Sequence, residues 1–219
     1  EIKRYDISTV KGSVIVKDFS AEKFKMHLKS NKVNVIKILP GGVVTAKDTA
    51  EIQLDEKGEF VRNPEEDIVK VAVVERHQGT GNVACGFLKG YGIKAGAVAL
   101  SIAHDSHNII VVGVNDEEME FAVNSLIAQE GGMVLVKEGK VIESMPMPIA
   151  GLMSDQSGEW VDEKLTAIHA KAYEELGIAG DVEPVMTLCF MSLAVIPEVK
   201  LTDMGLFDVT TFSFIPVEA

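Results

Sequence analysis

The sequence predicts an α+β fold built from mixed, largely antiparallel β-sheets and a few packed helices. Short runs rich in β-branched residues outnumber the helical segments, and neighbouring runs are often separated only by turns. This favours local antiparallel pairing over a doubly wound parallel sheet, which needs a crossover between strands. The chain has 219 residues, 47% of them hydrophobic, and is long enough to bury a sizeable core.

Residues 1–65 contain the weaker strand signals and are interpreted as a β-rich lobe or linker, separate from an α+β domain of residues 66–219. Ser20 is expected to cap a short helical turn, and Pro40-Gly41-Gly42 is typical of a turn. The strands expected in this part are 13–17, 33–39 and 51–55.

The apolar runs are longer in residues 66–219, and they predict one buried strand and several hairpins. Residues 98–102 and 109–114 are expected to form a hairpin with the loop 104–108 at its tip. The other strands expected here are 68–74, 133–136, 140–143 and 207–214.

Helical periodicity and capping residues predict three helices. The clearest begins at an N-cap, Asn115 or Asp116, has apolar residues at helical spacing from Met119, and ends before Gly131-Gly132. The other two are expected at 158–176, before Gly177, and at 185–193, after Pro184.

The densest polar patch is His104-Asp105-Ser106-His107-Asn108, which lies between apolar runs. Burying such groups without partners would cost roughly 1–3 kcal/mol each. They therefore either form a closed hydrogen-bond network or face a cavity, and we interpret them as a functional loop. His104 and His107 are the candidates for proton transfer, and all five residues are candidates for contact with a small molecule.

Two other chemistries are possible for this loop. His104, Asp105 and His107 could bind a metal if the loop folds so that both imidazoles converge, although the spacing alone is a weak signal. Asp105, Ser106 and His107 are the residue types of a hydrolytic triad, but adjacent residues in one loop seldom reach the required geometry.

Two further motifs have structural interpretations. Glu75-Arg76-His77, at a strand end, is interpreted as an ion pair within the chain beside a histidine, not as a catalytic set. The run Gly90–Gly96 lacks the dinucleotide-binding spacing because Ala95 stands where that motif requires glycine. Tight backbone packing, or a mobile flap, explains these glycines more simply.

Composition excludes several classes of function. The formal charge of −12 disfavours binding to nucleic acid. Cys85 and Cys189 lie in apolar surroundings and are expected to be free thiols in a reducing compartment. No apolar run reaches the length of a membrane span. The sequence therefore predicts a cytoplasmic protein that binds neither membranes nor nucleic acid.

Several longer segments, taken in order, resemble the bacterial and archaeal adenine deaminase family. The likeness extends from about residue 67 to residue 217 and is looser before that. The matching segments are Val73–His77, Gly86–Gly92, Ala103–Ile109, Pro148–Asp155, Val195–Asp203 and Gly205–Asp208.

The resemblance implies a hydrolase of the amidohydrolase superfamily that converts adenine and water to hypoxanthine and ammonia. Its catalytic core would be a metal-bearing (β/α)₈ barrel with manganese or iron, preceding the part seen here. Because these residues lack the barrel's His-x-His signature, the chain resembles the C-terminal region alone. We expect no metal in this chain, no activity from it in isolation, and a homo-oligomeric parent enzyme.

For the polar loop, we hypothesise that residues 104–108 reach over the mouth of the barrel of the same protein and contact adenine, because hydrogen-bond donors and acceptors are dense at this one hairpin tip. The alternative is a structural or oligomerisation domain with no catalytic contact. A third, weaker alternative is an autonomous metallohydrolase centred on His104, Asp105 and His107.

Overall fold

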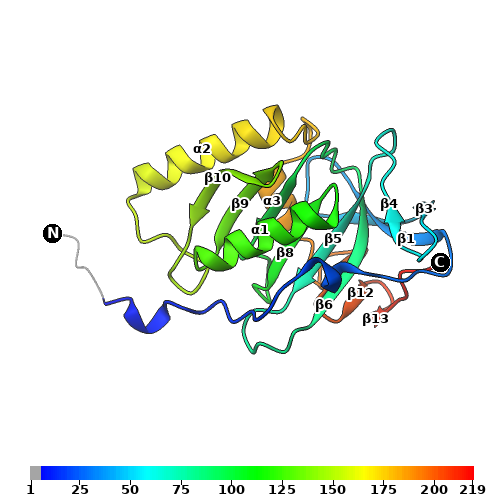
Figure 1. Ribbon diagram of the computed structural model, residues 1–219, viewed down its shortest axis with the longest axis horizontal. Coiled ribbons are helices and arrows are strands. Elements are labelled where there is room, and N and C mark those ends of the chain that lie inside the picture. The colour runs from blue at the N-terminus through cyan, green and yellow to red at the C-terminus, as the bar shows by residue number, and fades with distance from the viewer. Residues whose placement is uncertain (1–5) are drawn as a thin grey trace.

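An eight-stranded sheet crosses the molecule in the computed structural model, which describes residues 6–219 (Figure 1). Its order is β10-β9-β7-β8-β5-β6-β1-β2. The strands are β1 (Lys32–Ile38), β2 (Thr45–Glu51), β5 (Ile68–Val74), β6 (Val83–Lys89), β7 (Ala97–Leu100), β8 (Ile109–Gly113), β9 (Gly132–Lys137) and β10 (Lys140–Pro146). Neighbouring strands are antiparallel except for β1 and β6, which are parallel. The predicted α+β class is confirmed, and residues 6–219 contain no (β/α)₈ barrel.

Two smaller sheets flank the large one. They comprise β11 (Val199–Thr202), β12 (Gly205–Asp208) and β13 (Ser213–Phe214) in one, and β3 (Gln53–Leu54) and β4 (Phe60–Val61) in the other. The three-stranded sheet packs against β6. A Cβ atom at Gly86 would lie 3.6 Å from Leu201 and 3.8 Å from Leu206, so these leucines cover the strand closely.

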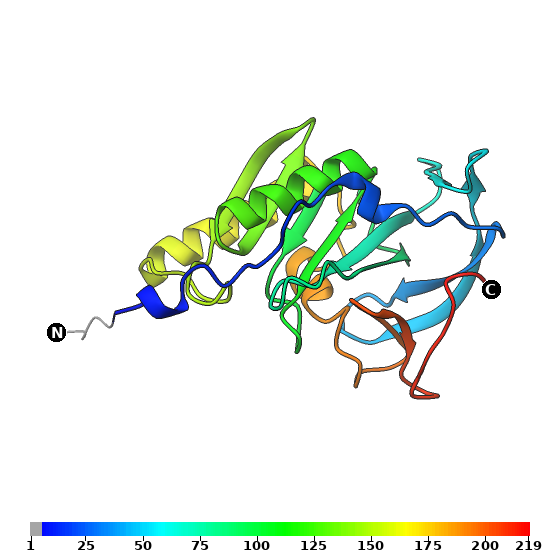
Figure 2. The same cartoon turned by 60° about the horizontal axis from the view of Figure 1, so that its bottom comes forward.

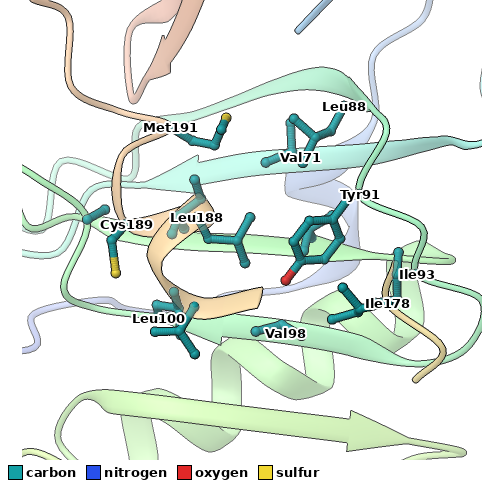
Figure 3. Close-up of a cluster of buried hydrophobic side chains, with 14 of the residues drawn as sticks. Val71, Leu88, Tyr91, Ile93, Val98, Leu100, Ile178, Leu188, Cys189 and Met191 are labelled. Atoms are coloured by element: carbon teal, nitrogen blue, oxygen red, sulfur yellow. The ribbon is translucent and has the colours of Figure 1, made fainter. Parts of the chain in front are cut away.

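Helices cover both faces of the large sheet. Within the described residues, the α-helices are α1 (Asp116–Ala128), α2 (Gly158–Glu174) and α3 (Pro184–Cys189), and the 3₁₀ turns are Ser8–Val10 and Ala21–Phe24. Ala97 and Ala99 of β7 pack in the same core as α1, whereas Val98 and Leu100 pack in the core with α2 and α3. This alternation follows the period of two along a strand. Figure 3 shows α3 in the second core, with Leu188 among side chains of the sheet.

The α-helices begin close to where the sequence predicts them, but α2 ends at Glu174 rather than at residue 176 and α3 ends at Cys189 rather than at residue 193. The predicted Ser20 cap is wrong, because its side chain makes no capping hydrogen bond to the 3₁₀ turn that follows. The Asn115 side chain accepts a hydrogen bond from the backbone N–H of Glu118, at 2.8 Å, and so caps α1. Ser157 caps α2 in the same way. None of the helices in residues 6–219 is both long and apolar enough to cross a membrane. Cys85 and Cys189 are free thiols, as predicted.

The glycines of the 90–96 run allow close backbone packing, as one of the two interpretations predicts. Gly92 and Gly96 have φ angles of +78° and +68°, which favour glycine. A Cβ atom at Gly96 would lie 1.9 Å from the carbonyl oxygen of Val136, and one at Gly92 would lie 2.6 Å from the nitrogen of Ala179. Both positions therefore exclude a side chain.

Several predicted strands are wrong. Residues 13–17 form no strand, because in that stretch only the N–H of Ile15 reaches a backbone partner, Arg76 O at 2.7 Å. The expected strand 51–55 is instead the end of β2 followed by the short β3. Residues 207–214 form a hairpin of β12 and β13 rather than one strand, because residues 209–212 turn between them.

Four strands are missing from the sequence prediction: β2, the short β4, β6 and β11. The β2 strand alternates between exposed and half-buried residues because it is the outer strand of the sheet. The strands β1 and β2 come from the predicted lobe of residues 1–65, yet they belong to the same sheet as strands of residues 66–219. The division after residue 65 stays a prediction.

Candidate functional site

The predicted polar loop lies at one end of the large sheet, in the connection 101–108 between β7 and β8. The hairpin itself is confirmed, and its connection is eight residues long. The register pairs Val74, at the end of β5, with Ile109, at the start of β8. Sheet pairing therefore brings the segment after β5, which contains Arg76 and His77, beside the loop.

Arg76 anchors the backbone around this loop. The side chain is buried, with 1% of its surface exposed, and its guanidinium donates to the carbonyl oxygens of His107 at 2.5 Å, Ala150 at 3.1 Å and Ser13 at 3.4 Å. Burial lowers the pKa of Arg76. One side chain thus joins the loop, the N-terminal segment and the turn that follows β10.

The expected ion pair in Glu75-Arg76-His77 is wrong. In residues 6–219 no carboxylate lies within 4.0 Å of the Arg76 guanidinium. Glu75 instead accepts hydrogen bonds from the backbone N–H groups of His77, Gln78 and Thr80 and from the Thr80 hydroxyl. These bonds outweigh the effect of burial and lower the pKa of Glu75 to about 2. Its carboxylate closes a turn.

Asn108 is a structural member of the loop. Only 4% of its surface is exposed. Its Nδ2 donates to Asp203 Oδ1 at 3.2 Å, and its Oδ1 accepts from the backbone N–H of Arg76 at 3.3 Å. Both ends of the side-chain amide are therefore engaged by the protein. Of the five predicted contact residues, Asn108 is the one that this geometry assigns to holding the loop in place.

Ser106 is also held by its neighbours. The His77 ring Nε2 lies 2.7 Å from the carbonyl oxygen of Ser106. The Ser106 hydroxyl accepts from the backbone N–H of Asn108 at 3.5 Å, a weak contact within the loop. Nothing in this arrangement activates the hydroxyl as a nucleophile, and it gives no support to a triad of Asp105, Ser106 and His107.

The two histidines of the loop lie close together and are half-buried. Their ring centroids are 5.6 Å apart, edge to face, and the His104 ring packs against Phe190 at 4.8 Å. Backbone hydrogen bonds fix both residues, from His104 N to Cys189 O and from His107 N to Ala103 O, each 2.7 Å long. The loop therefore presents two imidazoles on a fixed backbone.

His107 has an unused polar atom. Its Nδ1 is buried and has no hydrogen-bond partner among the described residues. Burial, followed by the charges of His104 and Arg76, lowers the pKa of His107 below its ordinary value. The ring is therefore neutral at pH 7 and carries one N–H donor and one acceptor nitrogen. A neutral imidazole can donate one hydrogen bond and accept another, although the Nδ1 atom itself is buried in this structure.

The loop does not assemble a metal site from this chain. Across residues 6–219, no three His, Cys, Asp or Glu side chains are grouped closely enough to hold a metal ion. His104, Asp105 and His107 therefore do not fit a metal, and we derive no step through one here. What the loop offers is hydrogen bonding by His104, Asp105 and His107 around a backbone fixed by Arg76, His77 and Asn108.

An apolar groove lies elsewhere on the described surface. This groove of about 510 Å³ is bounded by the turn 38–43, by Leu165 of α2 and by Met186 of α3, and the ion pair of His169 and Glu183 forms part of its wall. It shares no lining residue with the polar loop or its anchors. Within the loop itself, Asp105 and Ser106 are exposed, the two histidines are half-buried and Asn108 is buried.

Sequence reasoning missed the residues that hold the loop. Arg76 was interpreted as part of an ion pair, and neither Asp203 nor Phe190 drew attention. The one available signal was the order of elements, because an antiparallel neighbour of the 109–114 strand must end beside the loop. Residues 68–74 were expected to form a strand, so the following Glu-Arg-His segment was a candidate for that position.

Comparisons with known proteins agree with one another. A family model described as the adenine deaminase C-terminal domain matches residues 42–213. Adenine deaminase 2 of Desulfotalea psychrophila is 67% identical over 219 residues, which is all of this chain and 38% of that protein. The adenine deaminase of Ligilactobacillus salivarius is 50% identical over 218 residues, again 38% of its length. The chain thus spans less than half the length of these curated relatives.

Proposed function

This chain belongs to the adenine deaminase family, whose C-terminal domain it forms, and from this premise we propose that its polar loop completes the active site of a catalytic domain in the same protein. The reaction proposed for the whole protein is hydrolytic deamination of adenine. The oxygen of water bonds to C6 of the purine, the bond from C6 to the exocyclic nitrogen breaks, and hypoxanthine and ammonia leave.

The catalytic domain would supply the metal chemistry. As the resemblance implies, a divalent metal, proposed to be manganese or iron, activates the water in that domain. Residues of this chain would bind and orient the purine and exclude bulk water. We also propose, on the resemblance alone, that the whole protein is cytoplasmic and homo-oligomeric.

One observation supports the role of the loop more than any other: its backbone is fully anchored while its imidazoles keep unused hydrogen-bonding capacity. Arg76 holds the His107 carbonyl, and Asp203 holds Asn108. The Nδ1 atom of His107 has no partner in residues 6–219. A preorganised donor and acceptor loses little entropy on binding, which is what substrate positioning requires.

The chemistry of a purine edge suits a neutral imidazole. Ring nitrogens of adenine accept hydrogen bonds, and its amino group donates them. A neutral His107 can do both, and His104 lies beside it with its ring packed on Phe190. Protonation of the departing amine by one of the two rings is the further step that this position would allow.

The proposal is tested in the full-length protein with the double variant His104→Ala/His107→Ala. We expect turnover of adenine, measured as ammonia release, to fall at least about tenfold. The matched control is His27→Ala, which removes a histidine whose side chain is 72% exposed and whose partner is Glu59. Unchanged kcat and KM in the double variant, with an unchanged unfolding midpoint, would refute the role of the loop.

The alternative function is a structural or oligomerisation domain. It predicts that loop variants change the oligomeric state or the stability but leave the kinetics intact. We also expect this domain alone to release no ammonia from adenine, with or without added manganese or iron. Clear activity of the isolated domain would contradict the assignment of catalysis to a separate domain.

A further inference from the structure

Exposed apolar side chains gather on the three-stranded sheet of β11, β12 and β13. Met204 is 73% exposed, Phe212 75% and Phe214 52%, and we call these three residues the apolar stripe. Phe212 and Phe214 form one aromatic cluster, because the Phe207 ring lies 5.3 Å from that of Phe212 and 5.2 Å from that of Phe214. Met204 lies in the turn at the other end of β12. Single exposed apolar residues are common, but a contiguous aromatic patch marks an interaction surface.

The turn that carries Phe212 is built to hold its ring in solvent. Phe212 has a φ angle of +52°, a conformation that favours glycine or asparagine and strains the backbone of a bulky residue. Asp208 fixes the turn by accepting from the N–H of Thr210 at 2.9 Å, from its hydroxyl at 2.6 Å and from Thr211 N at 3.2 Å. These bonds, with the nearby Lys47 ammonium, hold the pKa of Asp208 far below its usual value.

A rigid turn with an exposed aromatic ring is the arrangement found at the centre of protein interfaces. Phenylalanine and methionine are enriched there, and a side chain that is already ordered loses little entropy when a partner covers it. The strained backbone at Phe212 is retained although a glycine would relieve it. The sheet therefore presents the ring to something that covers it.

The apolar stripe adjoins the polar loop. Asp203, next to Met204, accepts the hydrogen bond from Asn108 of the loop at 3.2 Å. In Figure 2 the small sheet, coloured orange to red, and the green tip of the 101–108 connection both lie along the lower edge of the molecule. A domain or subunit that covers the loop to enclose an active site would therefore also reach the stripe.

We propose that the apolar stripe is the surface on which the catalytic domain of the same full-length protein docks. This inference rests on the proposed function and names the contact that would seat the loop over the active site. More than half of each curated relative lies outside the region that this chain matches, so a domain large enough to cover the stripe is available within one chain. A second copy of this domain is the competing occupant.

The test is methionine oxidation of the full-length protein by dilute hydrogen peroxide, followed by mass spectrometry of peptides. Oxidation of methionine requires exposure of its sulfur. We expect Met204 to react at least about tenfold more slowly in the folded protein than in urea, although it is 73% exposed in this domain. Oxidation of Met204 at the unfolded rate would overturn the proposal.

The oligomeric state separates the two occupants. The same rates are measured over a dilution series followed by analytical ultracentrifugation. Protection of Met204 that persists in the monomer supports docking of the catalytic domain within one chain. Protection that disappears as the protein dissociates means that a second copy covers the stripe, and it overturns the proposal.

A pair of variants separates this inference from the function of the loop. Phe212→Ser/Phe214→Ser should expose Met204 to oxidation, whereas Phe121→Ser on α1, whose side chain is 37% exposed, should not. His104→Ala/His107→Ala should leave Met204 protected. If Met204 stays protected and the kinetics are normal in that loop variant, the docking surface stands and the role of the loop is refuted. If Met204 is oxidised at the unfolded rate and the kinetics are impaired, only the docking surface is refuted.

Discussion

The two ends of β5 each bury a cation, and they satisfy it in different ways. At the start of the strand, Lys70 is 4% exposed and donates to Asp116 Oδ1 at 2.7 Å, and Asp116 also accepts from Lys25 at 3.0 Å. Just beyond the other end, Arg76 is 1% exposed and donates to carbonyl oxygens and the Ser13 hydroxyl. One end is a closed network of opposite charges, and the other keeps its charge.

This difference distinguishes the purely structural polar cluster around Lys70 from the candidate functional site beside Arg76. The Lys70 ammonium is directed at Asp116 and at the carbonyl oxygen of Phe24, both within the fold. Burial lowers the pKa of His107, and the charges of His104 and Arg76 lower it further. The guanidinium also shapes the loop, because its donors are directed at backbone carbonyls. Burial of a charge is thus used for stability at one end and for positioning at the other.

The largest effect is expected at the closed end. Asp116→Ala leaves the Lys70 ammonium buried without a carboxylate, and loss of one partner of a buried pair costs about 3–5 kcal/mol. The free energy of unfolding, measured with urea, should fall by that amount. The control is Glu117→Ala, which removes an exposed acid from the same helical turn and should change it by less than about 0.5 kcal/mol. Equal effects of the two substitutions would show that the pair does not stabilise the fold.

Arg76→Gln should have a smaller effect on stability and a specific effect on the loop. The shorter side chain leaves carbonyl oxygens of His107, Ala150 and Ser13 without their donor, which we expect to cost about 2–3 kcal/mol. Hydrogen exchange of the amides at 103–108 should accelerate at least about tenfold, whereas that of the β9–β10 hairpin should not change.

The control for this substitution is Arg62→Gln. Arg62 also donates to a carbonyl, Ile93 O at 3.0 Å, but it lies away from the loop. It should leave exchange at 103–108 unchanged. If both substitutions leave the loop amides protected, the guanidinium of Arg76 is not what holds the loop, and the contrast between the two ends of β5 fails.

How much of this could be predicted from sequence depended on burial. The strand β5 has seven buried residues and is apolar except for Lys70, and the sequence predicts it. The outer strand β2 has lysine, threonine and glutamate on its exposed side and resembles a loop until β1 supplies its hydrogen bonds. An apolar run in the sequence identifies a strand that is covered on both faces of the sheet. It does not identify a strand whose main support is the hydrogen bonding of a neighbouring strand.

The same limit applied to the site. His104 to Asn108 were recognisable as a polar loop because apolar strands border them. Their anchors were not, since Asp203 is 95 residues away along the chain from Asn108. That contact depends on how the small sheet packs against the large one, and the sequence has no local pattern for it. The side chains that face a ligand could be predicted, and the side chains that hold them could not.

The smallest effect concerns a third buried cation, Lys200, which resembles Arg76 more than Lys70. It is fully buried, its Nζ donates to Val43 O at 2.9 Å, and no carboxylate within the described residues pairs with it. Burial lowers its pKa from 10.5 to about 8. The unfolded chain therefore binds more protons between pH 8 and 10.5, so stability should rise with pH across that window and carry the full penalty below it.

Lys200→Met should remove this slope and stabilise the domain by about 1–2 kcal/mol at pH 7, as urea unfolding at pH 7 and pH 10 would measure. Lys70→Met, which leaves Asp116 without its buried partner, should destabilise the domain at both pH 7 and pH 10. If the two methionine variants behave alike, the distinction between a paired and an unpaired buried cation has no consequence for the stability of this fold.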